Sequence, residues 1–168
     1  MAEPIQPAPQ GMSQWGPLAS FGDRAVAWFI DFGIILVGYV VVAIVGFVFG
    51  AISSTLGRLI GGLGYVAMVA VLVYLYYVQG EEGGTPGKRM TGLKGVKLVD
   101  GQVTGGGMGI VRQIAHAIDG AICYIGYLFP LWDPQRQTLA DKIVGTVVLR
   151  DQRKESFGPE LFQLPTST

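Results

Sequence analysis

The chain has 168 residues, of which 50% are hydrophobic and only 14% are charged, and its mean hydropathy is +0.45. A soluble globular chain carries about 25% charged residues, so a chain with this apolar load lacks the polar surface to cover a core. Twelve basic against twelve acidic residues argue against a nucleic-acid-binding protein, and one cysteine and one histidine exclude a disulfide framework and a multi-histidine metal centre. The composition therefore indicates a membrane protein.

The N-terminal segment, residues 1–20, contains four prolines and few apolar side chains. This composition predicts a disordered tail. Residues 1–22 contain no lysine or arginine, so the positively charged start of a signal peptide is missing. We therefore expect the first apolar segment to stay in the membrane rather than to be removed.

Two apolar segments follow, which we take as residues 25–50 and 59–78. Within them, Phe32 to Ala51 and Leu59 to Val78 are stretches of 20 residues without a charge. At about 1.5 Å per residue, each stretch reaches about 30 Å, the thickness of the hydrocarbon core. Both segments are predicted to be transmembrane helices.

Small residues recur at a spacing of four near the outer ends of these helices, as the pairs Gly46 and Gly50, and Gly57 and Gly61. Such pairs let two helix backbones approach closely. They fit a tight helical hairpin as readily as contact between two subunits.

A third apolar segment, residues 108–132, has a different character. Its uncharged part, 120–132, has only 13 residues and is too short to cross alone. In the preceding part Arg112, His116 and Asp119 share one helical face, and the opposite face is apolar. This pattern predicts an amphipathic helix at the membrane interface, or a helix whose polar face packs inside a bundle. The apolar face comprises Ile110, Ile114, Ala117 and Ala121.

The basic residues indicate the orientation of the chain. The short connection between the first two apolar segments carries only Arg58, whereas residues 79–107 carry four basic residues. The positive-inside rule then places the N-terminus and the second connection in the cytoplasm. We expect the four basic side chains to contact anionic lipid headgroups. They are Lys88, Arg89, Lys94 and Lys97.

Two short segments have the pattern of β-strands. Residues 94–99 alternate before an Asp-Gly turn signal, and residues 143–149 form a β-branched run. If these segments pair, they share one compartment, and the third apolar segment is re-entrant or interfacial. We favour this arrangement over three full crossings, because the residues beyond 132 are also rich in lysine and arginine.

Several motifs occur in an order that resembles the RDD family of small bacterial membrane proteins, named for an arginine and two aspartates. They are DRAVAWFID at 23–31, TPGKR at 85–89, GLKGVKLV at 92–99 and TLADKIVGT at 138–146. The resemblance spans about residues 21–149. It implies that Arg24 and Asp31 are the first two named residues, and that the second aspartate is Asp119 or Asp141. The family has no settled biochemical function, although transport, including cation/proton exchange, has been suggested.

Asp31 is the most informative of these positions. It lies seven residues beyond Arg24, about 10 Å deeper on the same helical face. An ionisable group there costs about 2.5–3.5 kcal/mol to insert, so it needs a partner or water. The candidate partners are Arg24, Arg112 and His116. Asp31 could bind an ion or proton, or an Asp31–Arg112 pair could only fix how two helices dock.

The fold class we predict is all-α and transmembrane, with two to three membrane helices, an amphipathic or re-entrant segment and a short cytoplasmic β-like element. A membrane domain at 21–150 precedes a polar tail at 151–168. We expect a multi-pass protein of the bacterial inner membrane, without enzymatic activity, cofactor or metal. Its function is transport or ion handling as a homo-oligomer or in a larger complex, or that of a non-transporting accessory, assembly or scaffold subunit. The residues expected to handle ions or pair helices are Arg24, Asp31, Arg112, His116, Asp119 and Asp141.

Overall fold

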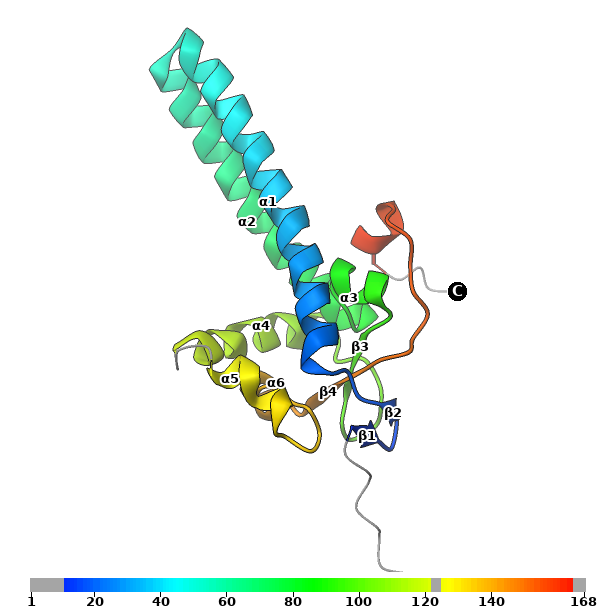
Figure 1. Ribbon diagram of the computed structural model, residues 1–168. Helices are drawn as coiled ribbons and strands as arrows, with labels where there is room; N and C mark the ends of the chain where they lie inside the picture. Colours follow the sequence, from blue (N-terminus) through cyan, green and yellow to red (C-terminus); the bar gives the residue numbers. More distant parts are fainter. Residues whose placement is uncertain (1–10, 122–124, 165–168) are drawn as a thin grey trace, which may run out of the picture.

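A computed structural model describes residues 11–121 and 125–164 (Figure 1). Helices α1 (Phe21–Ile52) and α2 (Ser54–Glu82) form a long hairpin that projects from the rest of the structure. We call the described residues outside this hairpin the base. The base contains β1 (Met12–Ser13), β2 (Gly16–Pro17), α3 (Pro86–Thr91), β3 (Lys94–Lys97), α4 (Gly106–Ala121), α5 (Ile125–Leu128), η1 (Phe129–Leu131), α6 (Leu139–Val144), β4 (Thr146–Leu149) and η2 (Pro159–Phe162).

The hairpin has the properties of two membrane spans. Both helices are long and apolar enough to cross a bilayer. In α1, which is described throughout, only Ala27 is buried. A soluble protein would bury such an apolar surface against other parts of the chain. In a membrane protein the lipid covers it, so it is not buried by the protein itself. The predicted helical segments 25–50 and 59–78 are confirmed as parts of α1 and α2.

The small residues near the tip pack the two helices of the hairpin against each other. A Cβ built at Gly57 would lie 2.5 Å from the Cα of Gly50, and one at Gly46 would lie 3.3 Å from the Cα of Gly61. The two backbones therefore leave little or no room for a side chain at Gly57 and Gly46, whereas a Cβ at Gly50 or Gly61 would meet no atom closer than 3.8 Å. Within the chain, Gly57 and Gly46 pack the hairpin.

Strands β3 and β4 pair antiparallel, with Lys94 opposite Leu149 and Lys97 opposite Thr146. The predicted strand at 143–149 was too long at its start, because Ile143 and Val144 belong to α6. A capping box begins this helix at Thr138, and Gly145 ends it with a φ of 69°. The strand starts only after that turn.

The predicted disordered tail at 1–20 is wrong for its second half, while residues 1–10 lie outside the described part. Residues 11–20 continue the sheet along the other edge of β4, where Ala19 N donates to Val148 O at 2.8 Å and Arg150 N donates to Pro17 O at 2.9 Å. Leu18 and Ala19 are fully buried. These contacts join positions about 130 residues apart, which local composition does not reveal.

The third apolar segment folds as α4 followed by α5 and η1, with a bend of 106° between the two parts. Because β4 pairs with β3 and with residues 17–19, the chain after this segment returns to the side where α1 begins and α2 ends. If α1 and α2 both cross the membrane, three full crossings are incompatible with this pairing. The re-entrant or interfacial arrangement is the one that the structure supports.

Residues 151–164, the described part of the predicted polar tail, pack against α3. Arg89 donates to both carboxylate oxygens of Glu155 and to Leu161 O at 3.2 Å. The Leu161 side chain is fully buried. Burial of one apolar side chain and the ion pair to Arg89 therefore dock this segment, while residues 165–168 lie outside the described part.

Candidate functional site

Three charged side chains from distant parts of the chain meet in the base, and we call them the Asp141 cluster: Arg24, Arg112 and Asp141. Arg24 Nη1 donates to Asp141 Oδ2 at 2.6 Å. Arg112 donates to Asp141 Oδ1 through Nε at 2.9 Å and also through Nη2. The Asp141 side chain is fully buried and that of Arg112 is 5% exposed. The carboxylate is thus bound by two guanidinium groups on its two oxygens.

Two capping boxes set the positions of the cluster along the chain. Ser20 and Asp23 cap the start of α1, one residue before Arg24. Thr138 and Asp141 cap the start of α6, with Asp141 N donating to Thr138 Oγ1 at 3.1 Å and Thr138 N donating to Asp141 Oδ2 at 3.2 Å. Each box satisfies backbone N–H groups that a helix leaves unpaired. The same carboxylate therefore caps the start of α6 and pairs with two arginines.

The electrostatic state of Asp141 follows from its partners. Burial by itself would raise the pKa of this carboxyl, but the charges of Arg112 and Arg24 hold its pKa well below its usual range. Thr146 Oγ1 donates a further hydrogen bond to Asp141 Oδ1 at 3.1 Å. Asp141 is thus a permanent anion at physiological pH, fixed by several donors.

The polar face of α4 is turned inward, as expected for a helix whose polar face packs inside a bundle. His116 Nδ1 lies 2.7 Å from Asp119 Oδ2, and the Asp119 side chain is fully buried. The His116 ring also stacks on Tyr127, with a centroid distance of 5.1 Å. His116 and Asp119 therefore form a second polar contact on the same helix face as Arg112.

Asp31 does not form the ion pair that we expected. Its Oδ1 accepts a hydrogen bond from Gly87 N at 2.7 Å. Among the described residues, Arg24 and Arg112 pair with Asp141 instead, and His116 pairs with Asp119. A Cβ at Gly87 would collide with Ala27 O, so the close approach of α3 to α1 that brings Gly87 to Asp31 requires glycine.

The four basic residues expected at lipid headgroups have different environments. Lys94 is exposed and Lys97 pairs with Asp100 at 3.1 Å, so both remain accessible. Arg89 is buried and bound to Glu155, which contradicts the predicted headgroup contact. Lys88 is turned towards the Asp141 cluster, where its charge interacts with those of Arg112 and Arg24.

The surroundings of Lys88 shift its titration. Burial is the main cause that lowers its pKa from 10.5 to about 7. The positive charge of Arg112 lowers the pKa of Lys88 further, and the negative charge of Asp141 raises it. Arg24 lowers this pKa and Asp31 raises it by smaller amounts. Lys88 is therefore close to half-charged near neutral pH.

We expect this lysine to make the folded protein more stable as the pH rises from about 7 towards 10. Over that range the unfolded chain, with its ordinary lysine pKa, binds more protons at this position than the folded chain, so stability rises with pH. In Lys88→Met the rise should be smaller, and stability below pH 7 should be higher than in the wild type. Unfolding in detergent, followed by tryptophan fluorescence at several pH values, measures this.

The exposed Lys94→Met substitution is the control and should leave the pH profile unchanged. Parallel wild-type and Lys88→Met profiles would contradict a buried, easily deprotonated Lys88.

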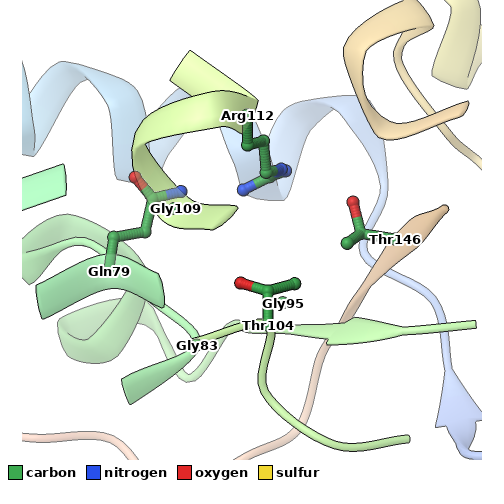
Figure 2. A pocket seen from close by; sticks show the side chains of 7 residues that line it. All are labelled: Gln79, Gly83, Gly95, Thr104, Gly109, Arg112 and Thr146. Carbon is green, nitrogen blue, oxygen red and sulfur yellow. The ribbon is translucent and has the colours of Figure 1, made fainter. Parts of the chain in front are cut away.

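A small recess adjoins Arg112 (Figure 2). Its volume of about 10 Å³ holds about one water molecule. Gln79 Oε1 is buried there and accepts no hydrogen bond from the residues that the structure describes. In the same part of the chain no group of three or more His, Cys, Asp or Glu side chains is arranged to hold a metal ion. The recess is lined by Gln79, Gly83, Gly95, Thr104, Gly109, Arg112 and Thr146.

Sequence reasoning did not identify three residues that complete the cluster: Arg136, Thr138 and Thr146. Arg136 O accepts from Arg24 Nη2 at 2.7 Å, and Arg136 Nη1 donates to Leu18 O at 3.0 Å. The order Thr-x-x-Asp at 138–141 is a recognisable capping signal, which would have identified Thr138 as the start of a helix. The roles of Arg136 and Thr146 depend on long-range contacts and left no local signal.

Comparisons with known proteins agree with the motif order. The sequence model of the RDD family matches residues 18–145, a range that includes the Asp141 cluster. The proline-rich antigen homolog of Mycobacterium tuberculosis is 50% identical over 95 residues, which cover 56% of this chain and 40% of that protein. The proline-rich antigen of Mycobacterium leprae is 47% identical over 95 residues, covering 56% of this chain and 38% of that protein. The chain thus matches about two fifths of these relatives' length, and no solved structure matches it.

Proposed function

Because the chain belongs to the RDD family, we propose that it is a membrane-anchored accessory or assembly module that does not itself transport ions. In this proposal the α1–α2 hairpin anchors the chain in the bacterial inner membrane, and the base is held at the cytoplasmic surface. The base then presents a rigid platform for a larger membrane complex or for further copies of the chain.

The state of Asp141 carries this proposal. An ion- or proton-translocating carboxylate must exchange its ligand, whereas Asp141 is fully buried and accepts from two arginines and Thr146. Breaking such a pair is costly, because it leaves buried charges without partners. The recess beside Arg112 admits about one water molecule and is too small for a hydrated ion. These features favour a static lock between α1, α4 and α6.

Two further observations support the anchoring role. The matched region is only 40% of the mycobacterial relatives, so in those proteins it is joined to additional chain. The base also carries exposed basic residues, among them Lys94, Arg153 and Lys154. Basic residues favour the cytoplasmic side and anionic headgroups, so we propose that both described ends of the chain are cytoplasmic.

Ion handling is the second candidate, and Asp31 is the observation that favours it. Asp31 lies in α1, forms no ion pair with an arginine of the described chain and is close enough to feel the charge of Lys88. A carboxylate so near a lysine that titrates around neutral pH could exchange a proton with it. The two candidates therefore differ in whether Asp31 and Lys88 are repeatedly protonated and deprotonated during function.

A flux measurement on the purified full chain separates them. We expect wild-type protein in sealed vesicles to give no proton flux above protein-free vesicles when a sodium or potassium gradient is imposed. An added ionophore must collapse the gradient, which shows that the vesicles are tight and the dye responds. Asp31→Asn and the exposed Asp151→Asn are measured alongside, with tryptophan fluorescence as the check on folding.

Flux from the wild type would overturn the non-transport proposal. If that flux disappeared in Asp31→Asn but persisted in Asp151→Asn, it would belong to Asp31 and the second candidate would hold.

A further inference from the structure

In helix α4 the polar side chains face the interior of the base and the apolar side chains face outward. Its polar residues point inward, with Arg112 4% and Asp119 0% exposed, whereas Ile114 is 67% exposed. The exposed apolar residues of α4 are Met108, Val111, Ile114 and Ile118. We call them the α4 face.

The level of this face along the hairpin is fixed by a close contact between α2 and α4. A Cβ at Gly80 would collide with Gly105 O, and one at Gly109 would collide with Tyr76 O. Gly80 is two residues beyond Val78, where the charge-free stretch ends, so it lies about 3 Å past that point. Helix α4 therefore starts at the depth where α2 leaves the hydrocarbon core.

The direction of α4 follows from Figure 1, where it runs away from the hairpin and roughly across its axis. Helix α6, which carries Asp141, lies on the side of α4 away from the hairpin (Figure 1). The Arg112–Asp141 pair joins α4 to α6 on that side. The α4 face is consequently turned towards the space beside the hairpin, which the bilayer occupies if the hairpin spans it, whereas α5 lies, like α6, on the side of α4 away from the hairpin (Figure 1).

We infer that α4 lies in the plane of the membrane, with the α4 face in contact with lipid at the boundary of headgroups and acyl chains. The bilayer is the occupant because this face continues the exposed apolar surface of α2 at the depth where that surface ends. An amphipathic helix is stable there with its apolar face buried about 5–10 Å.

This inference rests on the two-span hairpin of the proposed function and is independent of transport. It makes the Asp141 cluster the cytoplasmic side of an in-plane helix whose other side contacts lipid. The base would then be attached to the membrane at two places, the hairpin and the α4 face.

Depth-dependent quenching in the full chain tests the inference. Single cysteines at Val111→Cys and Ile114→Cys, in a Cys123→Ser background, are labelled with a fluorophore and reconstituted in phosphatidylcholine–phosphatidylglycerol vesicles. Lipids carry a nitroxide either close to the headgroup or close to the chain end. Both labels should be quenched more by the shallow nitroxide, at roughly 5–10 Å below the surface. Both wild-type side chains are exposed, so the labels should not disturb packing.

Two control positions define the scale. Val41→Cys, near the middle of α1, should be quenched most by the deep nitroxide. The exposed Gln14→Cys, between β1 and β2 on the side of the base away from the hairpin (Figure 1), should respond to aqueous iodide and to neither lipid. Labels at 111 and 114 that behave like position 14 would overturn the inference, as would labels that behave like position 41. A label at position 41 that escapes the deep nitroxide would instead show that the hairpin does not span, which is a failure of the proposed anchor.

Discussion

Replacing Asp141 with asparagine is expected to destabilise the folded protein by about 3–5 kcal/mol, the cost of removing one partner from a buried ion pair. Asparagine keeps the shape of the side chain and an oxygen that accepts hydrogen bonds. It leaves the charges of Arg24 and Arg112 without their shared anion in a buried site. The loss should therefore reflect charge rather than volume. Reversible unfolding in mixed micelles of increasing SDS fraction measures it.

The matched control is Asp151→Asn. Asp151 is on the surface, and its contact with Arg150 at 3.4 Å is solvent-exposed, so this substitution should change stability by less than about 0.5 kcal/mol. Equal stabilities of the two variants would contradict a structural role of the Asp141 cluster. Arg112→Met provides a second test from the other side of the pair, and it should also unfold more easily than the wild type.

Substituting alanine for Gly57 is expected to have the second largest effect, a loss of about 1–3 kcal/mol from overpacking. The added Cβ would lie 2.5 Å from Gly50 Cα and 2.9 Å from Gly46 O. Both are backbone atoms of α1, which cannot rotate away as a side chain would, so the helices must separate along the upper part of the hairpin. The same unfolding measurement reports the change.

Gly62→Ala is the control for helix propensity, because a Cβ at Gly62 would meet nothing within 4 Å. Alanine favours a helix over glycine by about 0.8–1.0 kcal/mol, so Gly62→Ala should be neutral or stabilising. If Gly57→Ala proved as stable as Gly62→Ala, the glycines would not pack the hairpin. A change in subunit number without a change in hairpin stability would point to the alternative role at a subunit contact.

The choice between three crossings and two was already constrained by charge and strand patterns. The basic residues beyond 132 and the two strand-like segments favour a return to one compartment, and the β3–β4 register shows that return directly. The amphipathic pattern of 108–132 likewise identified the face of Arg112, His116 and Asp119. It left open whether that face meets water or protein, because helical periodicity groups side chains without saying what covers them.

Neither the partner of Arg112 nor that of Arg24 was predicted correctly. Helical spacing put Asp31 on the same face as Arg24, seven residues away, while Asp141 is 117 residues away and Asp31 binds Gly87 N instead. Local geometry is readable from the sequence because it depends on spacing alone. A pair across such a separation depends on how α4 and α6 dock against α1.

The composition by itself indicated a membrane protein, since 14% charge averages the nearly charge-free segments 25–50, 59–78 and 108–132 with a remainder of ordinary polarity. Burial in lipid needs only apolar length, and apolar length can be counted along the chain. Which carboxylate joins the two arginines, that Lys88 faces them, and that α4 turns its apolar side outward were decided by the tertiary structure. Each of these depends on which surfaces meet when β4 pairs with both β3 and residues 17–19, and that pairing brings the two ends of the chain together.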